Sequence, residues 1–333
     1  MSTSTPLPND GLRTPVLFIA FKRFEESVAV MEGIRAARPQ RLYFASDGAR
    51  NEQEAVQVRR VRDLVKMVDW PCELKTRFSD TNQSVKFGPP AAISWFFAHE
   101  EEGIILEDDC KPVLSWFRFA QEMLERYRHD ERIWIIMGNN LMPERPAHDG
   151  ESYYYSAHGY GAYWGWASWR RMWRHYDVHM KDWPALRDSG LLNGHFLHKS
   201  EAREALNLLE STWDGRIHSW DFQLDYGRIA HGGMNIIPNV NLIRNIGFGG
   251  GSTHTASHLD PRNKDVAGEM AFPLKHPRFM VCDKERDLEY FEKYIEPSML
   301  RRLKNKLKKA LPKEFDQAIT PALGRLQRKL GIN

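Results

Sequence analysis

The chain has 333 residues with 47 basic and 44 acidic side chains, a formal net charge of +3. Its composition, 42% hydrophobic and 27% charged, is that of a globular protein, and the near-neutral charge argues against a generic nucleic-acid binder. That charge is unevenly divided. Residues 299–333 hold 10 basic and two acidic groups, a net of +8, which leaves 37 basic and 42 acidic groups, a net of −5, on the rest.

Membrane-spanning and secreted classes find no support in the sequence. The apolar stretch 16–21 is far shorter than the roughly 20 residues that a membrane helix needs, and the polar first fourteen residues predict no cleavable signal peptide. The cysteines Cys72, Cys110 and Cys282 are widely spaced and odd in number, which suits a reducing compartment. We therefore expect a cytoplasmic protein.

Apolar runs alternate with amphipathic stretches along the first third of the chain. Strands are predicted at 16–21, 41–45, 73–78 and 103–106, with helices at 25–37, 52–68 and 89–101 between them. This spacing predicts βαβ units and a parallel, doubly wound α/β sheet. Further along, the pattern predicts helices at 113–127 and 200–211 and a buried strand at 133–137.

The strongest local signal is the acidic run Glu107-Asp108-Asp109, directly after the fourth strand. Open α/β sheets bind ligands at the carboxyl ends of their strands, and carboxylates suit Mg²⁺ or Mn²⁺ that also binds phosphate. In an extended segment Glu107 and Asp109 would face a metal, while Asp108 would face sugar hydroxyls. The alternative is a turn whose acids favour the N-terminus of a following helix, with Pro112 in its first turn.

Arg23 and Asp47 follow the first and second strands and share that rim of the sheet. Arg23 could pair with a phosphate or a uracil carbonyl, and Asp47 could accept the imide N–H of uracil. Taken singly, each also fits an ordinary charged turn residue.

Asp221, in the sequence Ser219-Trp220-Asp221-Phe222, is a candidate general base. An inverting glycosyl transfer needs a carboxylate that removes the proton of the acceptor hydroxyl, and aromatic neighbours would raise its pKa. A helix N-cap is the alternative.

Two further segments have a functional and a plain interpretation. The aromatic segment 160–169 suits stacking on sugar rings, but most of its rings are expected in the core. The glycine-rich run 247–251 could be a loop near phosphate, followed by His254 as a candidate metal ligand. It lacks a Gly-Lys-Ser/Thr ending, which excludes a P-loop ATPase.

With these residues in place, the chain resembles glycosyltransferases of the GT-A fold. It is most similar to the branch that contains N-acetylglucosaminyltransferase I (glycosyltransferase family 13) and its bacterial relatives. The motifs follow the family's order from about residue 15 to residue 255: VLFIAFKR, YFASDG, ILEDD, WGWASWRRMW, SWD and IIPNVNLIRNIGFGGGSTHT.

The resemblance implies a role for each donor-side residue. Arg23 and Asp47 would hold the uracil of a UDP-sugar, and Glu107 and Asp108 would contact the ribose and the donor sugar. Asp109 would bind Mn²⁺ or Mg²⁺ bridging the two phosphates.

On the acceptor side, Asp221 would be the catalytic base, giving inversion, and Trp220 is grouped with the residues that bind the nucleotide sugar. We add His254 as a second metal ligand because it follows the glycine-rich loop. The chain departs from the family around residues 82–86, which leaves the sugar open, and it shows no signal anchor or stem, so a Golgi location does not carry over.

The expected fold is a single GT-A domain over 15–297, with a nucleotide-binding half (15–110) and an acceptor-side half (111–297). Residues 298–333 form a basic helical tail whose leucines at 300, 303 and 307 suit an interfacial helix on anionic lipid. A helix packed along the body explains the tail equally well. The location would be cytoplasmic, with the tail as a means of peripheral contact with the membrane.

The expected activity is metal-dependent, inverting transfer of a hexose, with N-acetylglucosamine as one candidate, from a UDP-sugar to a glycan or glycolipid. One alternative is a sugar-nucleotide pyrophosphorylase, disfavoured because no glycine-rich basic loop follows the first strand. The other is a catalytically silent glycan-binding module. Hydrolysis of UDP-sugar in the presence of Mn²⁺ would separate an enzyme from that module.

Overall fold

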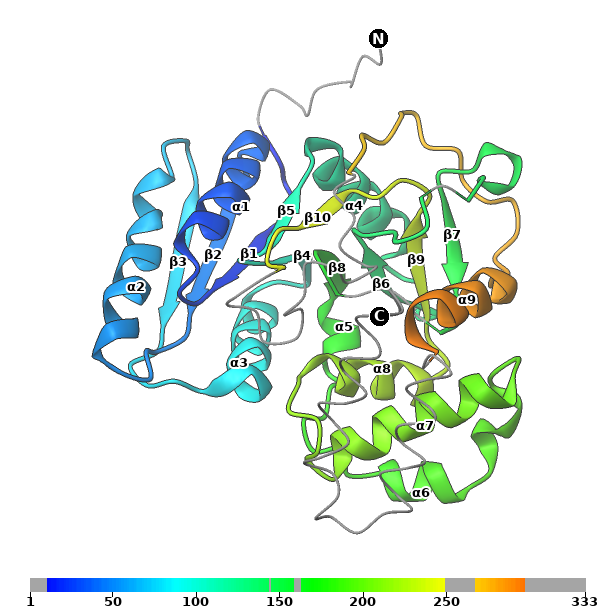
Figure 1. Cartoon of the computed structure of the whole chain (residues 1–333). Coiled ribbons are helices and arrows are strands. Elements are labelled where there is room, and N and C mark those ends of the chain that lie inside the picture. The colour runs from blue at the N-terminus through cyan, green and yellow to red at the C-terminus, as the bar shows by residue number, and fades with distance from the viewer. Residues whose placement is uncertain (1–10, 144, 159–162, 249–266, 297–333) are drawn as a thin grey trace, which may run out of the picture.

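The computed structural model describes residues 11–143, 145–158, 163–248 and 267–296 (Figure 1). The basic tail predicted at 298–333 lies outside the described residues. Within them, no helix has both the length and the apolar character needed to cross a membrane.

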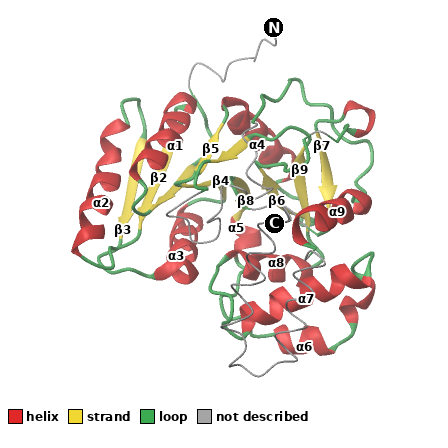
Figure 2. Ribbon diagram, viewed as in Figure 1, coloured by secondary structure: helices red, strands yellow, loops and turns green. Residues whose placement is uncertain are grey.

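Eight strands form one mixed sheet through the centre of the molecule (Figure 2). In spatial order the strands are β3 (Glu73–Phe78), β2 (Arg41–Ser46), β1 (Val16–Ala20), β4 (Glu102–Glu107), β8 (Trp166–Trp169), β6 (Ile133–Met137), β9 (Met234–Pro238) and β7 (Tyr153–Ser156). The first four strands in this order, β3, β2, β1 and β4, run parallel to one another. Strand β8 runs antiparallel to both β4 and β6, β6 and β9 are parallel, and β7 runs antiparallel to β9 at the far edge. The predicted fold class, a mixed and mostly parallel central sheet flanked by helices, is confirmed.

Helices cover both faces of this sheet. Tyr43 and Phe44 are neighbours on β2 and so point to opposite faces, yet both are buried. Tyr43 packs edge-on against Phe96 of α3, whereas α1 packs against α2 and α4. The helices are α1 (Phe24–Ala37), α2 (Glu52–Arg62), α3 (Ser84–His99), α4 (Leu114–Tyr127), α5 (Arg170–Trp173), α6 (Trp183–Asp188), α7 (Lys199–Trp213), α8 (Asp221–Ala230) and α9 (Lys284–Tyr290).

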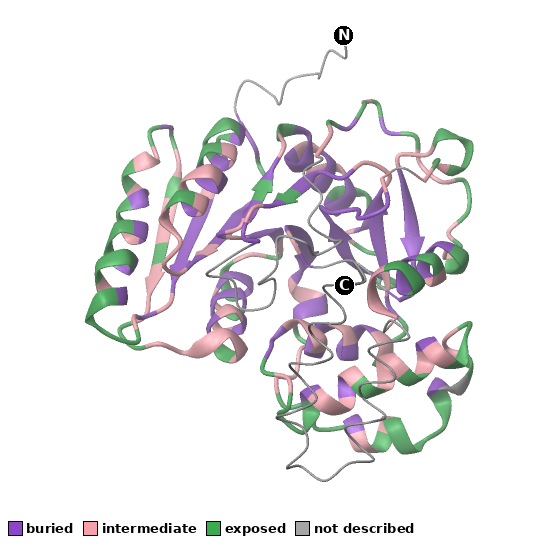
Figure 3. Cartoon of the chain, in the orientation of Figure 1, coloured by how far each residue is buried: buried purple, intermediate pink, exposed green. Residues whose placement is uncertain are grey.

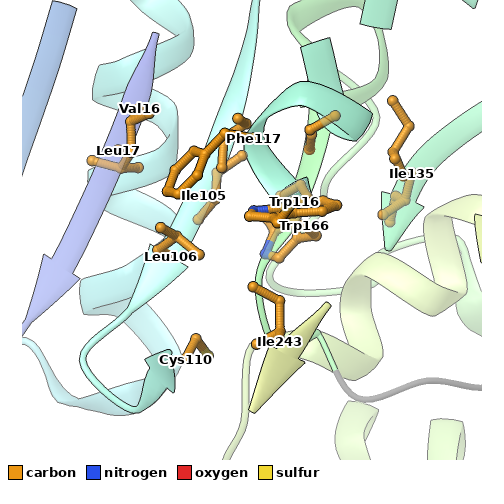
Figure 4. Packing of buried hydrophobic residues seen from close by; sticks show 14 of the residues in the cluster. Val16, Leu17, Ile105, Leu106, Cys110, Trp116, Phe117, Ile135, Trp166 and Ile243 are labelled. Atoms are coloured by element: carbon orange, nitrogen blue, oxygen red, sulfur yellow. The ribbon is translucent and has the colours of Figure 1, made fainter. Parts of the chain in front are cut away.

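The core lies along the central strands, as the buried residues in Figure 3 show. Four-residue and longer apolar runs such as those of β1, β4 and β6 are buried on both faces, the pattern typical of parallel strands covered by helices. Figure 4 shows Trp116 and Phe117 of α4 among the buried side chains of β1, β4 and β8.

The aromatic segment contributes to this core. Tyr163, Trp166, Trp169 and Trp173 are all buried, and Trp166 stacks with Trp220 at 6.1 Å between ring centroids. The plain interpretation of this segment, in which most rings fill the core, is confirmed. Residues 160–162 lie outside the described part of the chain.

A two-stranded antiparallel ribbon, which the sequence did not predict, joins β5 (Cys110–Pro112) to β10 (Ile243–Asn245). The interpretation that placed Pro112 in the first turn of a helix is therefore wrong. Residues 110–112 pair with a strand more than 130 residues away, and α4 begins only at Leu114.

The helix predicted from residue 89 begins five residues earlier, at Ser84. Pro89 and Pro90 lie inside α3, although proline favours the first position of a helix. Two polar contacts fix the earlier start: the side chain of Asn82 accepts the Ser84 N–H at 3.1 Å, and Asp47 accepts the N–H of Gln83 at 2.9 Å. A contact between segments thus sets where the helix begins.

Helices α6, α7 and α8 lie below the sheet in Figure 1 and share a small separate core around Trp183, Leu209 and Tyr226. Helix α9 is joined to the end of β7 by Asp287. Its carboxylate accepts the Ser156 hydroxyl at 2.5 Å and the Ala157 N–H at 3.0 Å.

Replacing Gly103 of β4 with alanine should destabilise the fold. An added Cβ would overlap the buried ring of Phe96 and lie 2.9 Å from the backbone oxygen of Pro15, neither of which can move away freely. We expect the free energy of unfolding in urea to fall by about 1–3 kcal/mol, as for other overpacked cores. Gly194→Ala is the control because nothing lies within 4 Å of its added Cβ. Equal stability of the two variants would contradict this packing.

Candidate active site

The acidic run lies in the turn between β4 and β5, at the carboxyl edge of the sheet. Glu107 ends β4, Asp108 and Asp109 form the turn, and Cys110 begins β5. The predicted extended alternation, with Asp108 pointing away from Asp109, is wrong. Because the chain turns there, both aspartates contact the same guanidinium group, that of Arg23.

Arg23 follows β1, the strand beside β4, and bridges the two aspartates. Its Nη2 lies 2.8 Å from Asp108 Oδ1 and its Nη1 lies 2.9 Å from Asp109 Oδ2. Burial of the guanidinium opposes its charge, but Asp108 and Asp109 outweigh that effect and raise the pKa of Arg23. The structure therefore brings three of the predicted site residues into one ion-pair cluster.

Two carboxyl groups of the acidic run, those of Asp108 and Glu107, have pKa values shifted from their usual range. Burial raises the pKa of Asp108 to about 6, against the attraction of Arg23, and the Phe21 N–H donates to its Oδ2 at 3.2 Å. Burial also raises the pKa of Glu107 well above its usual range, and Asp109 and Asp108 raise it further. The buried setting of Glu107 therefore favours its uncharged form more than that of an exposed glutamate.

Asp221 lies near this cluster, since its charge adds to the rise in the pKa of Glu107. It is the first residue of α8, and its Oδ1 accepts from the Ser219 hydroxyl and from the Phe222 N–H. Asp221 thus lies within electrostatic range of Glu107, although the two are more than 110 residues apart in the sequence.

Trp220, predicted among the residues that bind the nucleotide sugar, is buried at the start of α8. Its side chain is 4% exposed and packs against Tyr163 and Trp166. Its backbone carbonyl accepts the hydroxyl of Tyr176 at 3.0 Å. In this structure Trp220 anchors the start of α8 and presents little ring surface to a ligand.

Asp47 lies at the end of β2, and its carboxylate is surrounded by hydrogen-bond donors. Oδ1 accepts the N–H groups of Gly48 and Gln83, both at 2.9 Å, and Oδ2 accepts the Asn82 side-chain amide at 3.0 Å. Burial nevertheless raises its pKa, against these N–H donors. Asp47 therefore holds the turn between β3 and α3, a role that sequence reasoning missed.

The first residues of the glycine-rich run pack on the ion-pair cluster. The Ile246 N–H donates to the backbone oxygen of Asp109 at 2.8 Å. A Cβ added to Gly247 would overlap Arg23 and lie 2.5 Å from Asp109 Oδ2. Only glycine fits at this close approach. His254 lies outside the described residues.

The described side chains fit a metal held in part by substrate. Among them no group of three or more His, Cys, Asp and Glu side chains could hold a metal ion. Asp109 remains as a single carboxylate, 15% exposed, and Mg²⁺ is commonly held by one or two carboxylates together with substrate phosphates and water. Cys110 is unsuited, because burial raises its pKa well above the usual range and keeps it protonated.

A second charged cluster, which the sequence did not single out, lies beside this edge. Glu54 of α2 accepts from Lys22 Nζ at 2.7 Å and from the guanidinium of Arg50. Lys22 and Arg50 also lie over the ring of Phe21, 5.7 and 5.8 Å from its centroid. The cluster joins two segments, 21–22 and 50–54, that lie almost 30 residues apart in the sequence.

Comparisons with known proteins found similar folds only at low identity. No protein-family model and no curated protein matches the chain. HddC from Yersinia pseudotuberculosis is 12% identical over 49% of this chain and 80% of its own, with a TM-score of 0.29. A UDP-glucose pyrophosphorylase complexed with UDP-glucose is 10% identical over 50% and 79%, with a TM-score of 0.29. The glycosyltransferase GlyE of Streptococcus pneumoniae TIGR4 is 9% identical over 67% and 45%, with a TM-score of 0.32. At these scores the similarities do not bear on function.

Replacing Asp47 with asparagine should loosen the turn between β3 and α3. Asparagine keeps one oxygen for the N–H groups of Gly48 and Gln83, but its N–H₂ group replaces Oδ2, which accepts the Asn82 amide and shares the Gln83 N–H, both at 3.0 Å. The Asn82 amide therefore loses this partner and the Gln83 N–H loses one of its two acceptors. We expect a loss of about 1–3 kcal/mol in urea unfolding and faster hydrogen exchange at Gln83. Asp80→Asn, at an exposed neighbouring position, is the control. Unchanged exchange at Gln83 would show that Asp47 does not hold the turn.

Proposed function

We propose that this chain is a metal-dependent, inverting glycosyltransferase that moves a hexose from a UDP-sugar to a glycan or glycolipid acceptor. The observation that supports it most is the cluster at the carboxyl edge of the sheet. There Arg23 binds Asp108 and Asp109, with the buried Glu107 beside them and Asp221 within electrostatic range of Glu107. This edge is where open α/β sheets bind nucleotides.

The charges of the cluster support a requirement for a divalent cation. A diphosphate would enter a site where Asp108 and Asp109 share the one guanidinium of Arg23, while Lys22 is already bound to Glu54. Asp109 would hold Mn²⁺ or Mg²⁺ together with the phosphate oxygens. When bound, the metal would stabilise the negative charge of the leaving diphosphate.

The residues of the chain itself would bind and orient the donor. Glu107 and Asp108 would each form a hydrogen bond with a hydroxyl of the ribose or the sugar. Arg23 would face the phosphates once a cation takes its place beside Asp109. Asp47 and Gln83 would shape the side of the site at which the base binds.

The transfer step would use Asp221 as general base. The acceptor oxygen attacks the anomeric carbon while its proton passes to the Asp221 carboxylate. The bond from that carbon to the diphosphate oxygen breaks, and the diphosphate leaves with the electron pair. Ser219 and the Phe222 N–H hold the carboxylate in place.

The acceptor and the cellular setting are part of the proposal. An acidic body of net −5 and a tail of net +8 suit an acceptor on an anionic membrane surface, reached from the cytoplasm through residues 299–333. Deleting that tail should lower co-sedimentation with anionic liposomes, and no change would remove the membrane from the proposal.

Replacing Asp109 with alanine should abolish the Mn²⁺-dependent part of UDP binding. The variant loses the carboxylate proposed to hold the metal, but it also frees Arg23 from one of its two partners. Calorimetry with Mn²⁺ should therefore show much weaker binding than in the wild type, while binding without metal is unchanged or tighter. Asp63→Ala, at an exposed position far along the chain from the acidic turn, is the control. Undiminished Mn²⁺-dependent binding would contradict the metal assignment.

Replacing Asp221 with asparagine should leave UDP affinity unchanged and reduce sugar transfer by about 10²–10⁴-fold, the usual contribution of a general base. The assay first screens UDP-, GDP- and TDP-sugars for hydrolysis or transfer, and then compares the variant with the exposed control Asp188→Asn. Retained activity would place the base elsewhere. Formation of UDP-sugar from UTP and a sugar 1-phosphate would instead identify a pyrophosphorylase.

A further inference from the structure

Helix α8 carries a second carboxyl group beside the proposed base. Asp225 follows Asp221 by four residues, so the two side chains share one face of α8, with Cβ atoms about 5–6 Å apart. Burial raises the pKa of Asp225 to about 6 against the attraction of Arg228, and the charge of Asp221 adds to the rise. The transfer step described above gives Asp225 no role.

Asp225 is held through one of its two oxygens. The hydroxyl of Tyr163 donates to Oδ1 at 2.6 Å, and Nη2 of Arg228 lies 3.6 Å from the same atom. Both partners are buried, and the ring of Tyr163 packs against Trp166 and Trp220. The position of Asp225 is therefore set by buried side chains of the fold.

The second oxygen of Asp225 has room for a further hydrogen bond. No group in the part of the chain that the structure describes donates to Oδ2, and the side chain is 27% exposed. Asp221 is arranged in the same way, because Ser219 and Phe222 both donate to its Oδ1. Two neighbouring carboxyl groups of α8 are thus each anchored at one oxygen and can accept a hydrogen bond at the other.

This arrangement suits two hydroxyl groups on adjacent carbons of a sugar ring. Each hydroxyl can donate to one carboxylate, and such charge-assisted bonds are stronger than those between neutral groups. A phosphate or carboxylate of the ligand would instead meet like charge. A ligand that offers only the reacting hydroxyl would leave Asp225 without the bond that its position on α8 allows.

From these contacts we infer that Asp225 binds the acceptor, and that the acceptor carries a free hydroxyl on the carbon next to the one that reacts. The inference rests on the proposed function, because it adds a second acceptor contact to the proposed base. The reacting hydroxyl would donate to Asp221, and the neighbouring hydroxyl would donate to Asp225 Oδ2. Tyr163 would be a positioning residue that holds Asp225 through Oδ1.

The test measures transfer, with the donor identified by the sugar-nucleotide screen, to the methyl glycosides of glucose, galactose and mannose. For the best of these acceptors, the analogues with a hydrogen or an amino group in place of one hydroxyl are then compared. In the wild type, loss of a hydroxyl adjacent to the reacting one should raise the acceptor KM by at least roughly tenfold. This comparison needs no variant, so it does not depend on how a substitution affects folding.

The variant Asp225→Ala should raise the KM of the parent acceptor by a similar factor. It should leave the KM of the matching deoxy analogue at the wild-type value, because that analogue lacks the hydroxyl that Asp225 would bind. Tyr163→Phe should act in the same direction by a smaller factor. The control Asp188→Ala removes an exposed aspartate and should change neither KM, and UDP affinity with Mn²⁺ reports whether each variant is folded.

Four results would overturn the inference. They are equal use of the parent acceptor and all its deoxy analogues, preference for an amino analogue, an equal rise in KM in Asp188→Ala, and a loss of kcat without a change of KM in Asp225→Ala. Hydrolysis of the donor without transfer to any of the three glycosides would also overturn it, since each offers adjacent hydroxyls. Failure of the wild type to turn over any sugar nucleotide would instead overturn the proposed function.

Discussion

The contact between Arg23 and the two aspartates organises the carboxyl edge of the sheet. Asp108 and Asp109 are adjacent in a tight turn, where two like charges repel, and burial adds to the cost of each charge. The guanidinium of Arg23, which follows β1, offsets both effects. It also connects the ends of β1 and β4 beyond the last backbone pairing between these strands. Gly247 then packs on this ion pair, so the ribbon of β5 and β10 depends on it as well.

Asp47 and Asp109 show how two carboxylates at one edge acquire different roles. Asp47 accepts hydrogen bonds from three donors that belong to the backbone or to a neighbouring turn. The fold itself thus supplies the hydrogen-bond partners of both carboxylate oxygens. Asp109 shares one cation with Asp108, and among the described residues its other oxygen meets only the weak donor Cys110 Sγ at 3.3 Å. A charged ligand can therefore replace the partner of Asp109 far more readily than the donors around Asp47.

The sequence was sufficient where the side chains act locally, and insufficient where distant segments decide. The buried runs of β1, β4 and β6 are apolar enough to be read directly, and so is the position of the acids after β4. The orientation of Asp108 could not be predicted from the sequence, because the turn at Asp108 and Asp109 depends on the pairing of β5 with β10. The start of α3 depends on Asp47, and the burial of Trp220 depends on rings from another strand.

The hydrogen bonds that the Asp287 carboxylate accepts at the end of β7 affect how this edge of the sheet is covered. An edge strand presents unpaired N–H and C=O groups on which another chain can add a strand. At β7, the backbone oxygen of Tyr155 accepts the N–H of Asp283 at 2.9 Å, and Asp287 takes the donors that follow the strand. The opposite edge strand, β3, carries Lys75 and Arg77 in place of such a cover. One edge is thus closed to self-association by the chain's own later segment, and the other by charge.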